Sequence, residues 1–372
     1  AHFQTTQVNQ WNLTLQHQFG GDWLASVQYI GSESAHLIDS YQLNPAVYIP
    51  GNCTAGQYGL TAPGPCSTTS NTNYRRVFVL NKYPGVLEPN GTPTFGYVDT
   101  FDDGATSNYN GLLVALTKRL SKGLSGNVNY TWSHCIGDLN IGDSTGNAGA
   151  GYVDPSNRHR DRSNCQSNEI GGTFSADRRQ IFNLTLVYRT PRLANAWATR
   201  ALSDWVVTGI FRATSAFWLT VTLPTDVALT GATVERPNQI VANAAATNQG
   251  QACPNTAPCV SWINPNAFAT PATGTLGNLG KDNIAGPAFW QFDMSLVKEF
   301  RVYENHKLEF RADAFNLTNS FRPGIPMAAG ASGLAAGGSG VNTSFTPGST
   351  TFGTVTSALD PRIVQLSLKY SF

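Results

Sequence analysis

Apolar and polar residues alternate along several stretches of this chain, most clearly at 11–19, 292–300 and 364–372, with a looser copy at 112–120. In each stretch one face carries bulky apolar side chains, then a His, Lys or Tyr, then a closing Phe or Leu. Alternation of period two is typical of β-strands, because successive side chains of a strand point to opposite faces. The pattern predicts nine strands, at 7–19, 23–38, 108–120, 124–136, 180–191, 204–223, 289–302, 306–320 and 363–372.

The connections between these predicted strands alternate between short and long without exception. The short ones are 20–22, 121–123, 192–203 and 303–305, and the long ones are 39–107, 137–179, 224–288 and 321–362. Outer-membrane barrels have this asymmetry, with short periplasmic turns and long extracellular loops. A water-soluble β-sandwich could use the same alternation within strands, but connections of this length are uncommon in compact domains. The predicted fold class is therefore all-β, an antiparallel transmembrane β-barrel of the outer membrane with four long extracellular loops.

In this interpretation the apolar face of each strand meets lipid and the polar face lines the barrel. Leu13, Leu296 and Leu366 are predicted to face lipid, and the His, Lys or Tyr near the strand end can extend its polar tip to the headgroups. The predicted lumen-facing charges are Asp293, Glu299, Arg301, Glu309, Arg311 and Asp313. Two interpretations of these charges stay open: contact with a plug or a substrate path, or a ladder of ion pairs that satisfies the charges inside the barrel.

The six cysteines are close in sequence as three pairs: Cys53 with Cys66, Cys135 with Cys165, and Cys253 with Cys259. All of them lie in or beside the predicted long loops. Their spacing lacks the C-x-x-C pattern with a nearby His that is usual for metal sites. Three loop disulfides are therefore predicted, in an oxidising compartment outside the cytoplasm. Grouping by proximity is a hypothesis, since the sequence alone leaves the connectivity open.

Composition excludes two other classes of protein. Charged residues are 13% of the chain, with 24 Lys and Arg against 23 Asp and Glu, so no basic surface for nucleic acid is expected. No apolar run reaches the roughly 18 residues that a transmembrane helix needs. The chain begins at Ala1 without Met or a signal peptide, so we expect either a removed signal peptide or, in preference, a fragment of a longer protein.

No catalytic constellation stands out, and the sequence predicts no enzyme, no cofactor and no metal site. The densest polar cluster lies at 152–162, followed by Asp177. An enzyme or a metal site could recruit His159 with Asp154 or Asp161 from it. We prefer the interpretation of an extracellular loop with turn residues and surface ion pairs.

Two further loop features have a binding interpretation. Asp99, Asp102 and Asp103 could bind calcium, which prefers oxygen ligands, but they lack EF-hand spacing and a solvated loop is preferred. Aromatic residues that are predicted to be exposed in the loops would suit stacking on sugars: Tyr41, Tyr48, Tyr58, Trp262 and Phe268.

Five stretches together resemble the C-terminal barrel portion of TonB-dependent receptors, specifically the Oar-like type of Acidobacteria. They are QWNLTLQHQF, SNYNGLLVALTKRLSKGLSGNVNYTWSHCI, DRRQIFNLTLVYRTP, KLEFRADAFNLTNSF and DPRIVQLSLKYSF. Each stretch alone is a weak signal, but their order and spacing are specific and cover all nine predicted strands. The resemblance therefore spans the whole chain, 1–372.

The resemblance implies a barrel of about 22 strands, of which this chain supplies about the last nine, without the plug and the N-terminal domains. It implies TonB-dependent uptake of an unidentified nutrient, with a carbohydrate or an oligomer as candidates, and contact with TonB only through the missing N-terminal part. The other expected partners are outer-membrane lipid and the outer-membrane assembly machinery, which would read the C-terminal signal Leu366, Leu368, Tyr370 and Phe372. The alternatives are a structural or adhesion barrel that displays disulfide-pinned loops, and a passive porin.

Overall fold

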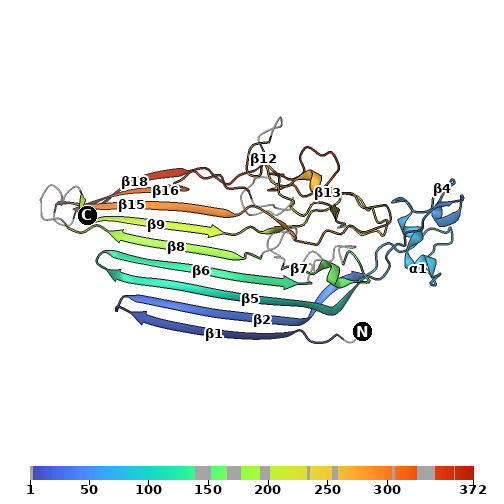
Figure 1. The fold of residues 1–372 in the computed structure, drawn as a ribbon, viewed down its shortest axis with the longest axis horizontal. Helices are drawn as coiled ribbons and strands as arrows, with labels where there is room; N and C mark the ends of the chain where they lie inside the picture. Colours follow the sequence, from blue (N-terminus) through green and yellow to red (C-terminus); the bar gives the residue numbers. More distant parts are fainter. Residues whose placement is uncertain are drawn as a thin grey trace.

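The computed structural model of the protein describes residues 3–138, 152–165, 177–192, 202–232, 235–253, 259–303, 306–324, 340–355 and 357–372. In this part of the chain, nine long strands follow one another in chain order across one antiparallel sheet (Figure 1). They are β1 (Gln7–Phe19), β2 (Trp23–Gln42), β5 (Asp99–Ser121), β6 (Leu124–Gly137), β8 (Gln180–Arg189), β9 (Trp205–Thr214), β15 (Phe289–Tyr303), β16 (His306–Phe315) and β18 (Ile363–Ser371). β1 and β18 are the two edges and do not pair with each other within the described residues. The predicted antiparallel all-β architecture is confirmed, and the closed barrel stays a prediction.

All nine predicted strands are present. β1 has the predicted bounds, and the ends of β6, β8, β15 and β18 differ from the prediction by two residues or fewer. Period-two alternation is a reliable signal here because each strand separates an apolar from a polar face along most of its length.

β2 and β5 are longer than predicted, because their outer parts are polar and lack apolar alternation. Residues 39–42 of β2 pair with 99–102 of β5, beyond two irregularities in the register. The predicted loop 39–107 is therefore only 43–98, and Tyr41 lies on β2 instead of in a loop. The prediction of a solvated loop at Asp99, Asp102 and Asp103 is wrong, since all three lie on β5.

β9 and β16 are shorter than predicted, because the chain leaves the sheet while its sequence still alternates. β9 ends at Thr214, and the apolar residues that follow, including Leu219 and Val221, are buried among the loops. β16 ends at Phe315, because Asn316 has a φ of 51° and its side chain accepts a hydrogen bond from the backbone of the residue four positions on. Alternation does not distinguish a strand of the sheet from an extended segment that is buried elsewhere.

The short connections lie at one end of the sheet and the long loops at the other (Figure 1). The loop elements are β3 (Asn52–Cys53), η1 (Gln57–Gly59), β4 (Gly64–Pro65), η2 (Thr72–Arg75), α1 (Val77–Leu80), η4 (Arg158–Asp161), β7 (Ser163–Asn164), β10 (Trp218–Leu219), β11 (Asn238–Gln239), β12 (Val260–Ser261), η6 (Pro265–Ala267), β13 (Phe268–Ala269), β14 (Ile284–Ala285) and β17 (Thr354–Val355). Parts of the predicted loops, such as 139–151 and 325–339, lie outside the described residues. No helix of the described segments is long and apolar enough to cross a membrane.

The apolar core of the protein lies among the long loops and not on the sheet. Its members include Val221, Ile263 and Phe268 from the β9–β15 connection and Phe352 and Val355 from the β16–β18 connection. Short strand pairs satisfy part of the loop backbone, and one of them, β12 with β17, joins the two connections. The two loops therefore fold together as one packed layer, which we call the loop core.

Candidate functional site

The register of the sheet gathers the apolar positions of the strands on one face, which we call the apolar face. Leu296 of β15 lies opposite Val207 of β9 and Ala312 of β16, and Ala312 lies opposite Leu366 of β18. Large exposed side chains on this face include Trp11, Leu13, Leu15, Val27, Val114, Leu186, Leu366 and Leu368. The three leucines that were predicted to face lipid thus share one surface. Exposed apolar surface on this scale marks a membrane or protein contact.

Aromatic side chains mark both limits of the apolar face. Trp11, Tyr29, Trp132 and Trp290 lie towards the loops, and Phe19, Trp23, Tyr188, Trp205, Phe300 and Tyr370 lie towards the short turns. On β15, Phe300 follows Trp290 by ten residues, which is about 33 Å along a strand and about 25 Å across a bilayer for a strand tilted by about 40°. This height matches the apolar band of outer-membrane barrels, which aromatic girdles border on both sides.

Two lysines on the apolar face direct their charge towards the short turns. Lys118 lies opposite Trp23, forms an ion pair with Asp22 of the β1–β2 turn, and has its Nζ 4.9 Å from the centroid of the Trp23 ring. Lys298 is 3% exposed, donates to a backbone carbonyl of the β8–β9 connection, and lies 5.5 Å from the Trp205 ring. The stems cover apolar surface and the ammonium groups reach the polar edge, as expected at a membrane interface.

The six predicted lumen-facing charges all lie on the opposite face, which we call the polar face: Asp293, Glu299, Arg301, Glu309, Arg311 and Asp313. Lys307 pairs across the strands with Glu299 at 3.2 Å, whereas Arg311 pairs along its own strand with Asp313 at 2.7 Å. Asp293 accepts hydrogen bonds from the Gln291 side chain. One ion pair thus crosses the two strands, whereas Glu299 lies opposite Glu309 and Arg301 lies opposite Lys307. The ladder of ion pairs and the contact with a plug or substrate both stay predictions.

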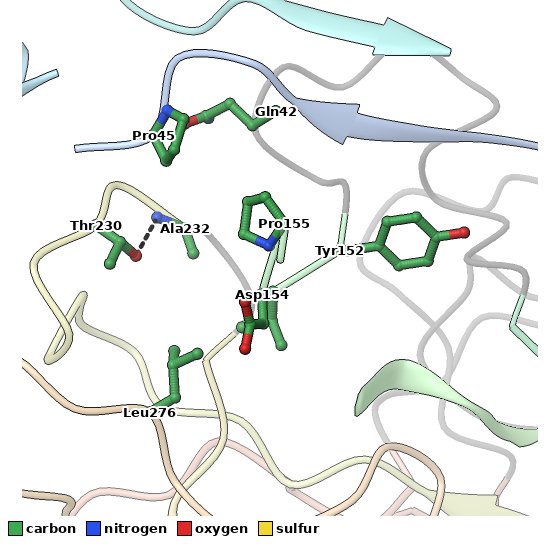
Figure 2. Close-up of a pocket in the computed structure, with 9 residues that line it drawn as sticks. Gln42, Pro45, Tyr152, Asp154, Pro155, Thr230, Ala232 and Leu276 are labelled. Atoms are coloured by element: carbon green, nitrogen blue, oxygen red, sulfur yellow. Dashed lines mark hydrogen bonds between the residues drawn. The ribbon is translucent and has the colours of Figure 1, made fainter. Parts of the chain in front are cut away.

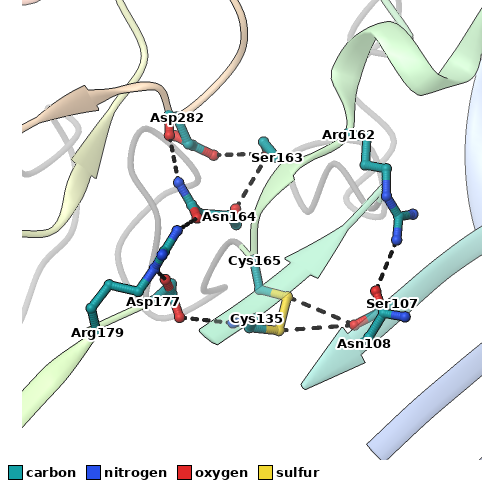
Figure 3. Close-up of a disulfide and its surroundings, with 10 residues drawn as sticks. All are labelled: Ser107, Asn108, Cys135, Arg162, Ser163, Asn164, Cys165, Asp177, Arg179 and Asp282. Atoms are coloured by element: carbon teal, nitrogen blue, oxygen red, sulfur yellow. Dashed lines mark hydrogen bonds and ion pairs between the residues drawn. A yellow bond between two sulfur atoms is a disulfide. The ribbon is translucent and has the colours of Figure 1, made fainter. Parts of the chain in front are cut away.

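All three predicted disulfides are formed, as Cys53–Cys66, Cys135–Cys165 and Cys253–Cys259. The second joins the end of β6 to β7 at the base of a long loop (Figure 3). Asp177 accepts a hydrogen bond of 2.9 Å from the backbone N–H of Cys135, and its other carboxylate oxygen binds Arg179 at 2.8 Å. The disulfide and this ion pair together hold the loop ends against the sheet.

The polar cluster at 152–162 forms ion pairs that are more buried than the sequence suggested. Asp161 lies 2.6 Å from the guanidinium of Arg236, and both side chains are less than 5% exposed. The prediction of surface ion pairs is therefore wrong for this pair, because the cluster packs against the β9–β15 connection. A buried pair needs both partners, because removing one leaves an uncompensated charge.

Asp138, next to the end of β6, is fully buried and organises a second part of this cluster. Although burial raises the pKa of Asp138, hydrogen bonds from Thr106 and Arg162 hold it below its usual value. His159 lies 3.4 Å from the same carboxylate. Asp102, one of the residues considered for calcium, pairs with Arg158 at 2.7 Å. In the segments that the structure describes, no group of three or more His, Cys, Asp or Glu is placed to hold a metal ion.

A small pocket with a volume of about 120 Å³ lies between the outer end of β2 and the loops (Figure 2). Its lining includes Gln42, Pro45, Asp154, Pro155 and Leu276. Tyr152 also borders the pocket, but its ring points away from the space (Figure 2). Burial raises the pKa of Tyr152, and the nearby carboxylates of Asp39 and Asp102 raise it further, so the hydroxyl stays protonated.

Aromatic residues that were predicted to stack on sugars pack mostly against the protein itself. Phe268 is 4% exposed within the loop core, so its prediction as an exposed loop residue is wrong. Trp262 packs against the same core and donates from its indole nitrogen to a backbone carbonyl. Tyr48 covers Gly274, where a Cβ would lie only 2.3 Å from the ring. Two other aromatic side chains in the loop between β2 and β5, Tyr83 and Phe95, are more than 45% exposed. Neither was among the predicted sugar-stacking residues.

Two carboxyl groups lie together in the β9–β15 connection. Glu235 is 2% exposed and accepts hydrogen bonds from the backbone N–H groups of Val227 and Ala228, and Asp226 accepts from the N–H of Gly231 at 2.8 Å. Burial, and then a hydrogen bond with Asp226, raise the pKa of Glu235 to about 8. Its carboxyl group therefore titrates near neutral pH.

The predicted assembly signal is the apolar side of the edge strand β18. Leu366, Leu368, Tyr370 and Phe372 alternate along it and are 54–91% exposed. The Tyr370 hydroxyl lies 2.5 Å from Nδ1 of His306 on the neighbouring strand. These four side chains are thus presented together at one edge of the sheet, and their recognition by the assembly machinery stays a prediction.

Comparison with known proteins identifies a family and a similar structure. A family model described as "Outer membrane beta barrel domain" matches residues 1–365. The crystal structure of the outer membrane transporter YddB from Escherichia coli is similar, with a TM-score of 0.40 and 11% sequence identity, and the match covers 98% of this chain. The chain spans 32% of the length of that structure. A search of the curated proteins found no match.

Proposed function

Because the chain belongs to the family of outer membrane beta barrel domains, we propose that it is part of the wall of a receptor that takes up a nutrient with energy supplied through TonB. Its location is the outer membrane. In the proposed arrangement, the apolar face contacts outer-membrane lipid and the polar face lines the path of the nutrient. The candidates for the nutrient are a carbohydrate or an oligomeric substrate.

The observation that carries the proposal is the separation of the two faces across nine strands. A lipid-facing band bordered by aromatic residues needs a bilayer, and a polar face with charged residues needs water or protein inside the barrel. Lipid does not tolerate open sheet edges, because their backbone groups would be unsatisfied. We therefore propose that β1 and β18 pair with further strands of a larger barrel, which is the architecture of TonB-dependent receptors.

The proposed partners follow from the same resemblance. We assign the contact with TonB to an N-terminal segment of the receptor and not to the barrel strands. We assign recognition by the assembly machinery to the exposed side chains of β18 and to the adjacent Phe372. The proposed role involves neither catalysis nor nucleic acid.

The main alternative function is a structural or adhesion barrel. The observation in its favour is the extent of order in the loops, which have three disulfides and an apolar core of their own. Such loops would suit the display of a fixed surface. A passive porin is the third candidate.

Uptake by intact cells tests these functions. Cells with and without the gene would be supplied with labelled oligosaccharides, and uptake would be measured before and after a protonophore removes the energy of the inner membrane. Gene-dependent uptake that stops with the protonophore supports the receptor. Uptake that continues indicates a porin. Attachment to surfaces without any gene-dependent uptake indicates display, and the receptor would then be withdrawn.

A further inference from the structure

Between the short turns and the register irregularities of β2 and β5, the charged residues at paired positions of the polar face are confined to one half of the sheet. Beyond these irregularities, Asp39 of β2 lies opposite Asp102 of β5. At paired positions the cations are Arg189, Arg212, Arg301, Lys307, Arg311 and Lys369, and the anions are Asp293, Glu299, Glu309 and Asp313. All ten lie on β8, β9, β15, β16 and β18. Cations therefore outnumber anions on this half of the face.

The excess of two cations remains when the ion-paired groups are left out. Two of the four anions have a cationic partner within 4 Å, namely Glu299 and Asp313. By contrast, Arg189, Arg212, Arg301 and Lys369 are exposed and form no ion pair within 4 Å with any residue that the structure describes, although Glu309 lies opposite Lys369 in the register. These four residues, which we call the free cations, come from four different strands. Guanidinium and ammonium groups that have no anionic partner in the protein can form charge-assisted hydrogen bonds with the carboxylate or phosphate groups of a ligand.

Between the short turns and the same irregularities, the other half of the polar face has no charged residue at a paired position, and its strands β1 and β6 are rich in amide and hydroxyl groups. Its members on β1 and β6 include Asn12, Thr14, Gln16, Gln18, Ser125, Asn127, Asn129 and Thr131. Of these, Asn127 donates to Thr117 of β5 at 2.8 Å. Amide and hydroxyl groups both donate and accept hydrogen bonds, so they match the hydroxyl groups of a polyol or sugar.

From the two halves of the polar face we infer that the solute carried along it is an anionic, hydroxyl-rich molecule, of the class of acidic oligosaccharides. The free cations would bind its carboxylate or phosphate groups, and the neutral half would bind its hydroxyl groups. This inference rests on the proposed transport function and adds the charge of the solute to it. A field of one sign along a channel wall also raises the local concentration of solutes of the opposite sign.

Binding of three matched sugars to the full receptor tests the inference. Trimers of galacturonate, glucose and glucosamine are anionic, neutral and cationic at similar size, and equilibrium dialysis measures their affinities. We expect the galacturonate trimer to bind about tenfold or more tightly than the glucose trimer, as one or two charge-assisted hydrogen bonds would provide. The glucosamine trimer should bind most weakly, and the preference should shrink as salt screens the charges.

Two double variants distinguish an effect of the free cations from an effect of the net charge of the protein. Arg212→Gln with Arg301→Gln should remove most of the preference for the anionic trimer. Lys82→Gln with Lys122→Gln is the matched control, because it removes the same charge from an exposed loop and an exposed turn and should leave the preference intact.

The outcomes distinguish this inference from the proposed function. Equal affinity for the three trimers in a receptor that shows energy-dependent uptake would overturn the inference and leave the transport function standing. An unchanged preference in Arg212→Gln with Arg301→Gln, together with a less stable receptor, would also overturn it and indicate that the free cations contact protein. Anion preference without energy-dependent uptake would refute the transport function while the binding property of the polar face remained.

Discussion

Placing a charge on the apolar face tests the orientation of the sheet. Leu296 lies between Trp290 and Phe300, about 20 Å along the strand from the first and about 13 Å from the second at roughly 3.3 Å per residue. It is therefore close to the middle of the apolar band, where Leu296→Arg should cost about 2–4 kcal/mol of folding free energy. Val302 lies beyond the girdle residue Phe300, so Val302→Arg should cost only about 0–1 kcal/mol.

A matched control is available at the adjacent position. Ser295 lies on the polar face opposite Thr208 and Asp313, so Ser295→Arg should change stability by less than about 0.5 kcal/mol. The assay is urea unfolding of the full protein in phosphatidylcholine vesicles, followed by tryptophan fluorescence. Equal costs for Leu296→Arg and Ser295→Arg, or a larger cost at Val302 than at Leu296, would show that the apolar face does not meet lipid.

Three further predictions concern the loops and the last strand. Replacing both Cys135 and Cys165 by Ser should remove about 3–4 kcal/mol of loop stability, by the chain-entropy relation for a separation of 30 residues. Trypsin should therefore cleave the 152–165 segment faster, and an unchanged rate of cleavage would contradict this prediction. Because the folded loop keeps a proton on Glu235 that the unfolded loop loses above its ordinary pKa of 4.5, loop stability should fall as pH rises from about 4.5 to about 8. Glu235→Gln should abolish that fall, measured as the hydrogen-exchange protection factor of the Val227 amide, and an equal fall in wild type and variant would refute the assignment. Deleting Phe372 should lower the fraction of protein inserted into the outer membrane, measured by resistance to unfolding in cold detergent, whereas insertion at the wild-type level would exclude it from the assembly signal.

The sequence by itself determined the strands and their faces. Leu296 and Asp293 were assigned to opposite sides from alternation alone, and the register places them there together with their neighbours on β9. This succeeds because the face of a strand residue depends only on its position along the strand. The lengths of the connections likewise determined which end of the sheet carries the loops. The sequence left the connectivity of the six cysteines open, and the structure contains the pairing that was grouped by proximity.

Only the tertiary structure decided what the long loops do. Asp161 and Arg236 are 75 positions apart in the chain, and neither has a local signal that identifies the other as its buried partner. Phe268 had the same appearance in the sequence as an exposed loop aromatic, but it packs against Phe345 and Phe352 of another loop, which also contact each other. The free cations on the polar face could also not be predicted. Whether a cation has an anionic partner depends on the neighbouring strands, which can be far away in the sequence. Contacts between distant segments depend on how the whole chain is arranged, and period-two alternation contains no information about them.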